Sequence, residues 1–224
     1  RLSEARKLCP HAVVLPSDYE TYSLFSHRMY AIVRRYTPAV EEYGIDECFA
    51  ELSGLRRTLR MTYPQIAASI KRDLELELGI TFSIGLSCTK VLAKLGSKWN
   101  KPSGLTVIPY NETERFLDKT SVGKVWGIGP NSAAFLNTHG VRTALDFVRK
   151  DEAWVCRLNK PLVELWQELS GEAVMELDLI GHDSYQSISK TRTFTPPSTD
   201  SDFVFSQLSK NIENACLKLR RYNL

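Results

Sequence analysis

The chain has 224 residues, of which 43% are hydrophobic and 25% charged, and this composition is typical of a folded globular protein. Its length allows one large domain or two to three small ones, and no apolar run approaches the roughly 20 residues that a membrane-spanning helix needs. The net charge of +3 permits a nucleic-acid partner without requiring one, and the five widely spaced cysteines argue against a zinc site or a disulfide framework.

The two ends of the sequence predict a piece of a longer protein. It has no initiator Met, it begins with a charged amphipathic segment rather than a signal peptide, and it stops at Leu224 just after a predicted helix. The odd number of isolated cysteines fits a reducing compartment. We therefore expect a cytoplasmic protein without a membrane partner.

Helical and strand-like patterns alternate in the first half of the chain. Apolar residues at i, i+3 and i+4 predict helices, and β-branched apolar runs predict strands. In chain order the predicted elements are a helix at 1–8, a strand at 12–15, a helix at about 19–36, strands at 39–45 and 48–52, a helix at 64–78, a strand at 81–87, a helix at 89–99 and a strand at 105–108. This order predicts an α+β fold, with an antiparallel-leaning sheet and helices on one side of it.

From about residue 111 the predicted elements are short helices separated by glycines. They lie at 112–117, 131–139, 143–149, 152–158 and 161–169. After them, an acidic and weakly periodic stretch predicts a linker, residues 186–194 a strand, and residues 200–221 a long amphipathic helix. The domain boundaries predicted from these changes are 1–118, 119–175, a linker at 176–185, and 186–224.

Two adjacent acidic residues, Asp46 and Glu47, stand between the two short strands predicted at 39–45 and 48–52. Neighbouring side chains of a strand point to opposite faces, so a shared role for both requires a bend. A strand–acid–acid–strand hairpin would aim both carboxylates at Mg²⁺, which prefers carboxylate and substrate-phosphate oxygens. Two such ions would activate an attacking oxygen and stabilise a leaving one. The alternative is a polar hairpin turn, because acidic residues are common in turns.

Basic residues follow the strand predicted at 81–87. Four lysines recur at helical spacing: Lys90, Lys94, Lys98 and Lys101. Helix N-termini attract phosphate, so this segment predicts contacts with a triphosphate or with a DNA backbone; the alternative is a solvated lysine face. A second basic cluster near the end of the chain includes Lys190 and Arg192.

A third pattern, VWGIGP, lies at 125–130 between two predicted helices. Apolar–Gly–apolar–Gly followed by small residues is typical of a helix-hairpin-helix. Gly127 and Gly129 would let the backbone approach a phosphate closely and present N–H groups to it without reading sequence. The alternative is a plain connection between two helices.

Together and in this order, these segments resemble the Y-family translesion DNA polymerases of the DinB/UmuC type. YGIDECF at 43–49 is similar to the family's Ser-Ile-Asp-Glu-Ala palm motif, and the segments 85–94 and 100–105 are similar to its next palm block. The segment 125–129 resembles the thumb hairpin, and 5–10 the region that leads into the palm.

The resemblance implies domains and roles. Residues 1–118 would form the palm with a remnant of the fingers, 119–175 an all-α thumb with a helix-hairpin-helix, and 186–224 the start of an α+β little finger. Asp46 and Glu47 would be two of three carboxylates that bind two Mg²⁺ ions, and Lys101 would contact the triphosphate of the incoming nucleotide.

Further expectations concern DNA and partner proteins. Gly127 and Gly129 would grip the DNA backbone, with Lys90 and Lys94 adding positive charge. Lys190 and Arg192, in the little-finger part, would extend the DNA contact. The partners would be primer-template DNA, a dNTP, a sliding clamp and SOS accessory proteins, and the setting would be the bacterial nucleoid.

The sequence also departs from the family pattern. The first acidic motif, with the third carboxylate and the steric-gate aromatic, is absent, so we predict that this chain alone is inactive while its parent is a DNA-directed DNA polymerase. Gly44 and Cys48 replace the usual Ser and Ala, and Trp126 leans toward the UmuC subtype. The alternatives are a non-catalytic DNA-binding module and a nucleotidyl cyclase, against which the thumb-like glycine pattern argues.

Overall fold

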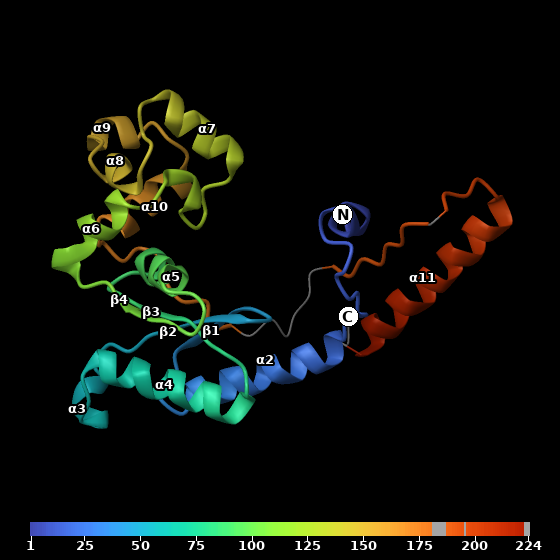
Figure 1. Ribbon diagram of the computed structural model, residues 1–224, viewed down its shortest axis with the longest axis horizontal. Helices are drawn as coiled ribbons and strands as arrows, with labels where there is room; N and C mark the ends of the chain where they lie inside the picture. The colour runs from blue at the N-terminus through green and yellow to red at the C-terminus, as the bar shows by residue number, and fades with distance from the viewer. Residues whose placement is uncertain (181–186, 195, 222–224) are drawn as a thin grey trace. The chain divides into compact units, whose positions relative to one another are not determined.

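The computed structural model describes residues 1–180, 187–194 and 196–221 (Figure 1). The chain forms two compact units, Arg1–Leu179 and Ile180–Leu224. Within the described residues, no helix has both the length and the apolar character needed to cross a membrane.

The first unit begins with α/β structure and ends with short helices. Its elements are α1 (Leu2–Leu8), α2 (Tyr19–Arg34), β1 (Val40–Gly44), β2 (Glu47–Ala50), α3 (Leu55–Leu59), α4 (Tyr63–Leu78), β3 (Ile84–Leu86), α5 (Lys90–Trp99), β4 (Leu105–Val107), α6 (Thr113–Asp118), α7 (Pro130–Thr138), α8 (Ala144–Val148), α9 (Glu152–Val155) and α10 (Lys160–Leu169). The described part of the second unit contains α11 (Ser201–Arg221). The expected α+β class is confirmed.

The strands form two separate pairs. β1 and β2 are antiparallel, with Val40 opposite Ala50, and a register irregularity lies between Glu42 and Gly44. β3 and β4 are parallel and are connected through α5. The mainly antiparallel sheet expected from the sequence is therefore found only in the β1–β2 pair.

Glycine controls the contact between α5 and β3. A Cβ added at Gly85 would lie 1.9 Å from the carbonyl oxygen of Ala93 and 2.3 Å from the backbone nitrogen of Ser97, so only glycine fits there. The neighbours Ile84 and Leu86 instead pack toward the core formed by α2 and α4. Helices thus cover both faces of this strand pair (Figure 1), whereas the sequence predicted helices on one side. The reason is the alternation of side chains along β3.

Two apolar clusters stabilise the first unit. The first joins α2, β1 and α4, and its buried members include Ile32, Val33, Val40, Ile66 and Leu74. The second joins α5 to the short helices, and its buried members include Leu92, Leu117, Leu136, Phe147 and Leu169. The helix α4 is also well bounded, since Thr62 and Gln65 form a capping box at its start and Gly79 takes a positive φ at its end.

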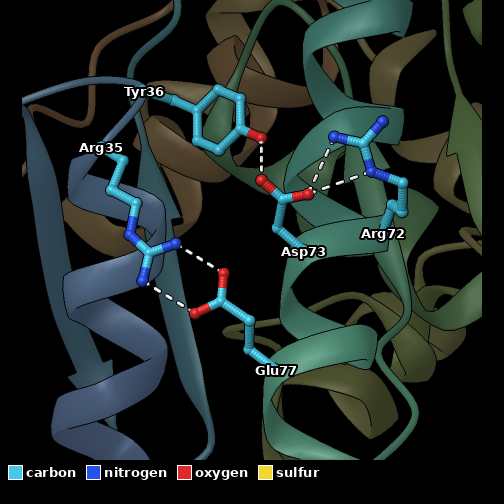
Figure 2. Close-up of polar contacts among 5 residues, drawn as sticks. All are labelled: Arg35, Tyr36, Arg72, Asp73 and Glu77. Carbon is cyan, nitrogen blue, oxygen red and sulfur yellow. Dashed lines mark hydrogen bonds and ion pairs between the residues drawn. The ribbon is translucent and has the colours of Figure 1, made fainter.

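Charged side chains fasten the end of α2 to α4 (Figure 2). The guanidinium of Arg35 donates to both oxygens of Glu77, at 2.5 and 2.8 Å. The Tyr36 hydroxyl donates to Asp73, and burial raises the pKa of Tyr36 to about 12. The hydrogen bond from Tyr36 in turn lowers the pKa of Asp73. These contacts fix α2 and α4 beside each other underneath the strands.

Three local predictions differ from the structure. Residues 12–15 form no strand, and Val13 and Leu15 are 83% and 77% exposed. In the strand predicted at 186–194, residue 186 lies outside the described residues and 187–194 are not in a strand. The amphipathic helix predicted at 200–221 forms as α11, but its apolar side chains are exposed and not buried, with Phe205 at 69% and Ile212 at 54%.

Candidate active site

The carboxylate pair lies at the tip of the β1–β2 hairpin. Asp46 occupies the turn and is exposed, whereas Glu47 begins β2 opposite Gly44 and is half-buried. The Tyr30 hydroxyl of α2 donates to the carbonyl oxygen of Gly44 at 2.5 Å and thereby anchors the turn. Next to the pair, burial raises the pKa of the Cys48 thiol to about 11, so this neighbour stays neutral. The bend that a shared role requires is therefore present.

Glu47 is paired with a buried lysine of α5. The Nζ of Lys94 lies 2.6 Å from Oε2 of Glu47, and the Lys94 side chain is only 8% exposed. A buried ammonium needs such a partner, because its desolvation is unfavourable otherwise. The sequence predicted Lys94 as a DNA or phosphate contact, and in the structure its ammonium pairs with the Glu47 carboxylate.

Lys90, one turn before Lys94, is also engaged within the chain. Its Nζ lies 2.6 Å from Oε2 of the buried Glu41 and donates to the carbonyl oxygen of Glu176 at 3.1 Å. The same Glu41 oxygen accepts from the backbone N–H of Asp178 at 3.0 Å. Lys90 therefore ties β1 to the segment 176–178, and the exposed lysine face that periodicity suggested is reduced to Lys98 and Lys101.

A cavity of about 930 Å³ opens between the two strand pairs and brings the predicted residues together. Its lining includes Asp46, Glu47, Lys94, Lys101 and Ser103. The carboxylates and two lysines, which lie far apart in the sequence, thus border one space. Much of the remaining lining is apolar and comes from α2, α4 and β3.

The turn that carries Lys101 is fastened to α4. The Ser103 hydroxyl donates to Glu75 at 2.6 Å and accepts from Lys71 at 2.8 Å, and Lys71 also pairs with Glu75 at 2.7 Å. Hydrogen bonds lower the pKa of Glu75 to about 2: the largest effect comes from Lys71, the next from Ser103 and a smaller one from the backbone N–H of Phe82. This network positions Lys101 at the rim, where its own side chain remains exposed.

The two carboxylates fit a divalent cation by the chemistry of their donors. Hard oxygen ligands suit Mg²⁺, which is commonly held by one or two carboxylates together with substrate phosphate. Within the described residues, no group of three or more His, Cys, Asp or Glu side chains is arranged for a metal. Asp46 and Glu47 therefore supply part of a ligand set, with room for further oxygen ligands in the cavity.

The glycine pattern at 125–130 leads directly into α7, which begins at Pro130. Gly127 takes a φ of +92°, and a Cβ there would lie 3.0 Å from Leu165. The fold therefore favours glycine at this position. Gly129 is extended at the N-cap of α7, and nothing lies within 4 Å of an added Cβ. In the described residues, the backbone N–H of Gly129 makes no hydrogen bond to the chain. An approaching anion would find this group accessible.

Aromatic contacts that the sequence did not predict join the segment 125–129, here called the glycine loop, to the β1–β2 hairpin. The indole N–H of Trp126 donates to the Tyr43 hydroxyl at 3.0 Å, and the Trp126 ring lies 5.4 Å from those of Tyr43 and Phe49. Trp126 thus contacts a residue that lies 83 positions away in the sequence. No local pattern signals a contact of that separation.

Lys190 and Arg192 belong to the second unit. Both are exposed, and the Arg192 guanidinium donates to Gln207 of α11 at 2.9 Å. Their predicted DNA contact stays a prediction.

Comparison with known proteins shows what the chain is similar to. Residues 1–98 match the model of the impB/mucB/samB family. A DNA polymerase IV of Desulfatibacillum aliphaticivorans is 42% identical over 146 residues, which cover 65% of this chain and 36% of that protein. A DNA polymerase IV of Methanoculleus marisnigri is 30% identical over the whole chain and 61% of that protein. The chain is thus similar over its whole length to a DNA polymerase IV.

Solved structures show a similar fold. The fold of this chain is similar to that of DinB from Sulfolobus solfataricus, with a TM-score of 0.64 and 24% identity over 75% of this chain and 50% of that one. A Y-family DNA polymerase chimera of Dbh and Dpo4 gives a TM-score of 0.71 and 23% identity over 96% of this chain and 62% of that one. The chain spans between 36% and 61% of the length of the two curated relatives described above.

Proposed function

We propose that this chain is the central part of a translesion DNA polymerase, which performs template-directed nucleotidyl transfer past damaged DNA. The observation that carries the proposal is the meeting of Asp46, Glu47 and Lys101 around one cavity. The similarity of the chain to the impB/mucB/samB family model and to a DNA polymerase IV supports the same reaction.

In the proposed reaction, the primer 3′-oxygen attacks the α-phosphorus of the incoming dNTP in line, and pyrophosphate leaves. Lys101, exposed at the rim on a turn fixed to α4, would contact the triphosphate. Asp46 and Glu47 would hold Mg²⁺, with two ions in the complete site. When bound, the metal activates the attacking oxygen and neutralises charge on the phosphates. The residues of this chain contribute position and charge, which lower most of the barrier in such transfers.

The proposed domains follow the sequence boundaries. Residues 1–118 would be the palm with a remnant of the fingers, 119–175 the helix-hairpin-helix thumb, 176–185 the linker and 186–224 the start of the little finger. The open N-cap at Gly129 supports a backbone-phosphate contact from the thumb. Lys90 and Lys94 are engaged in ion pairs with Glu41 and Glu47, so we assign them to positioning the palm rather than to direct DNA contact.

The proposed partners are primer-template DNA and a dNTP. A neighbour of similar fold is described as a ternary complex of Dbh, which supports this pair of ligands. A sliding clamp, SOS accessory proteins, a cytoplasmic, nucleoid-associated location and the UmuC-leaning subtype complete the proposal, and they rest on family resemblance.

The test uses the parent protein that contains this chain. Asp46→Asn should lower Mg²⁺-dependent primer extension by at least about a hundredfold, because one metal-binding carboxylate is lost, while DNA binding in a gel-shift assay stays within about twofold. Glu114→Gln, on the exposed surface of α6, is the control and should leave both measurements unchanged. The alternative, a non-catalytic DNA-binding module, predicts no effect of Asp46→Asn on any activity of the parent.

A further inference from the structure

Lys94 is an unusual residue for a helix that faces a cavity, because its charged group is almost completely removed from solvent. The residue is 7% exposed, and its ammonium lies 2.6 Å from Glu47, whose own side chain remains 39% exposed. A buried cation is strongly unfavourable unless it is paired. Lys94 therefore depends on Glu47 more than Glu47 depends on Lys94.

Two aromatic rings contact the same ammonium while it is paired with Glu47. Its Nζ lies 5.4 Å from the ring centroid of Tyr43 and 6.0 Å from that of Phe49, both within the range of cation–π attraction. Trp126 holds these rings in place, through its hydrogen bond to the Tyr43 hydroxyl and its contacts with both rings. The aromatic contact of the Lys94 ammonium is thus formed by β1, β2 and the glycine loop together.

We propose that Lys94 is a tethered cation that neutralises Glu47 before a divalent ion binds and withdraws onto the Tyr43 and Phe49 rings when the ion is bound. The proposal rests on the metal-binding role proposed above for Glu47. Lys94 is in this sense a positioning residue: it keeps the carboxylate oriented in the empty site, and it weakens ion binding by charge repulsion.

The neighbouring lysines on the same helix cannot take this part. Lys90 lies 5.0 Å from the centroid of the Phe49 ring, but it is fixed by Glu41 and by the carbonyl oxygen of Glu176 and does not contact Glu47. Lys98, one turn after Lys94, is exposed. Lys98→Gln removes the same charge from the same helix without touching Glu47, and it is therefore the matched control.

The experiment measures Mn²⁺ binding to the full chain by electron paramagnetic resonance at low salt. Two charges of like sign a few ångströms apart repel even in a water-like dielectric, so Lys94→Gln and Lys94→Met should bind Mn²⁺ about tenfold more tightly than the wild type. Lys98→Gln should change the affinity by less than about twofold, because an exposed and more distant charge is screened. Circular dichroism checks that every variant is folded.

The outcomes separate the inference from the function on which it rests. Binding that is lost in Glu47→Gln but unchanged in both Lys94 variants would overturn the inference alone. If the wild type binds no Mn²⁺, or binds it equally well in Glu47→Gln, then the metal role of Glu47 fails and the inference fails with it. Tighter binding in both Lys94 variants, and not in Lys98→Gln, supports the exchange of one cation for another.

A second measurement follows the withdrawal itself. Movement of an ammonium toward Tyr43 and Phe49 changes the field at the adjacent Trp126, so Mg²⁺ should shift the tryptophan emission of the wild type. The shift should vanish in Trp126→Phe, which removes the reporter, and in Lys94→Met, which removes the moving charge. A shift of wild-type size in Lys94→Met would contradict the proposed movement.

Discussion

Glu168 of α10 is the buried carboxylate on which the junction between α5 and the short helices depends. It is 0% exposed, and its two oxygens accept three backbone N–H groups, from Val91 at 3.2 Å, Val174 at 2.9 Å and Met175 at 2.8 Å. The carbonyl of the same residue accepts from the hydroxyl of Thr89, the N-cap of α5. Replacing the side chain by Ala should therefore loosen three segments at once.

The magnitude follows from the donors that would lose their acceptor. A buried N–H left without a partner costs about 1–3 kcal/mol, and partial entry of water makes the three contributions less than additive. We expect Glu168→Ala to lower the free energy of unfolding by about 3–5 kcal/mol, which corresponds to a decrease in Tm of about 6–20 °C for a chain of this size. Glu168→Gln keeps one acceptor oxygen, so its free energy of unfolding should lie between that of the wild type and that of Glu168→Ala.

The assay is urea unfolding followed by circular dichroism. Glu164→Ala is the matched control, since this residue lies one turn earlier on α10 and makes only a 3.5 Å pair with the exposed Lys160. That substitution should cost less than about 1 kcal/mol. A loss for Glu168→Ala within about 1 kcal/mol of the control would refute the view that this carboxylate joins the three segments.

Two further predictions concern the frame of the cavity. Gly85→Ala should destabilise the chain by at least about 2 kcal/mol in the same urea assay, because the new Cβ would lie 1.9 Å from the backbone of α5. The control is Gly129→Ala, which should cost less than about 1 kcal/mol because nothing lies within 4 Å of its added Cβ. Equal losses of unfolding free energy in the two variants would contradict the close-packing argument. Glu75 has a folded-state pKa lowered to about 2 from an ordinary 4.5, so its stabilising contribution is complete above about pH 4.5 and is lost as the pH falls toward 2. The difference in unfolding free energy between wild type and Glu75→Gln should accordingly shrink over that interval, and a difference that is constant from pH 6 to 2 would show that the Lys71 and Ser103 contacts do not act on this group.

Much of the backbone could be predicted because the signals are local. Apolar periodicity located α4 and α5 to within about one residue of the observed ends, and in the structure the caps Thr62, Gly79 and Thr89 satisfy terminal backbone groups in their own neighbourhood. The bend between the strands at Asp46 was also predictable, because two strand-like runs flank it. These features need no knowledge of distant parts of the chain.

The charge arrangement could not be predicted in the same way. The partners of Lys90 and of Val91 lie 49 and 77 positions away, so their pairing exists only after the fold has formed. Helical spacing alone makes Lys90 and Lys94 look like a solvated face. What distinguishes them from Lys98 is the approach of Glu41 and Glu47 from the hairpin, which no periodicity in α5 encodes.

The element that unites these observations is α5, because each of its faces has a different task. Gly96 lets it lie directly against β3, where Gly85 approaches to 3.1 Å of the Cβ that Gly96 lacks. Val91 and Leu92 are completely buried in the cluster of short helices. Lys94 faces the carboxylate hairpin on a third side. A rotation of α5 by a few tens of degrees would therefore break the sheet contact, the second core and the Glu47 pair together. The position of a charged group at the cavity is thus set by apolar packing on both other faces of the helix, and substitutions in that packing should alter ion binding without touching a ligand.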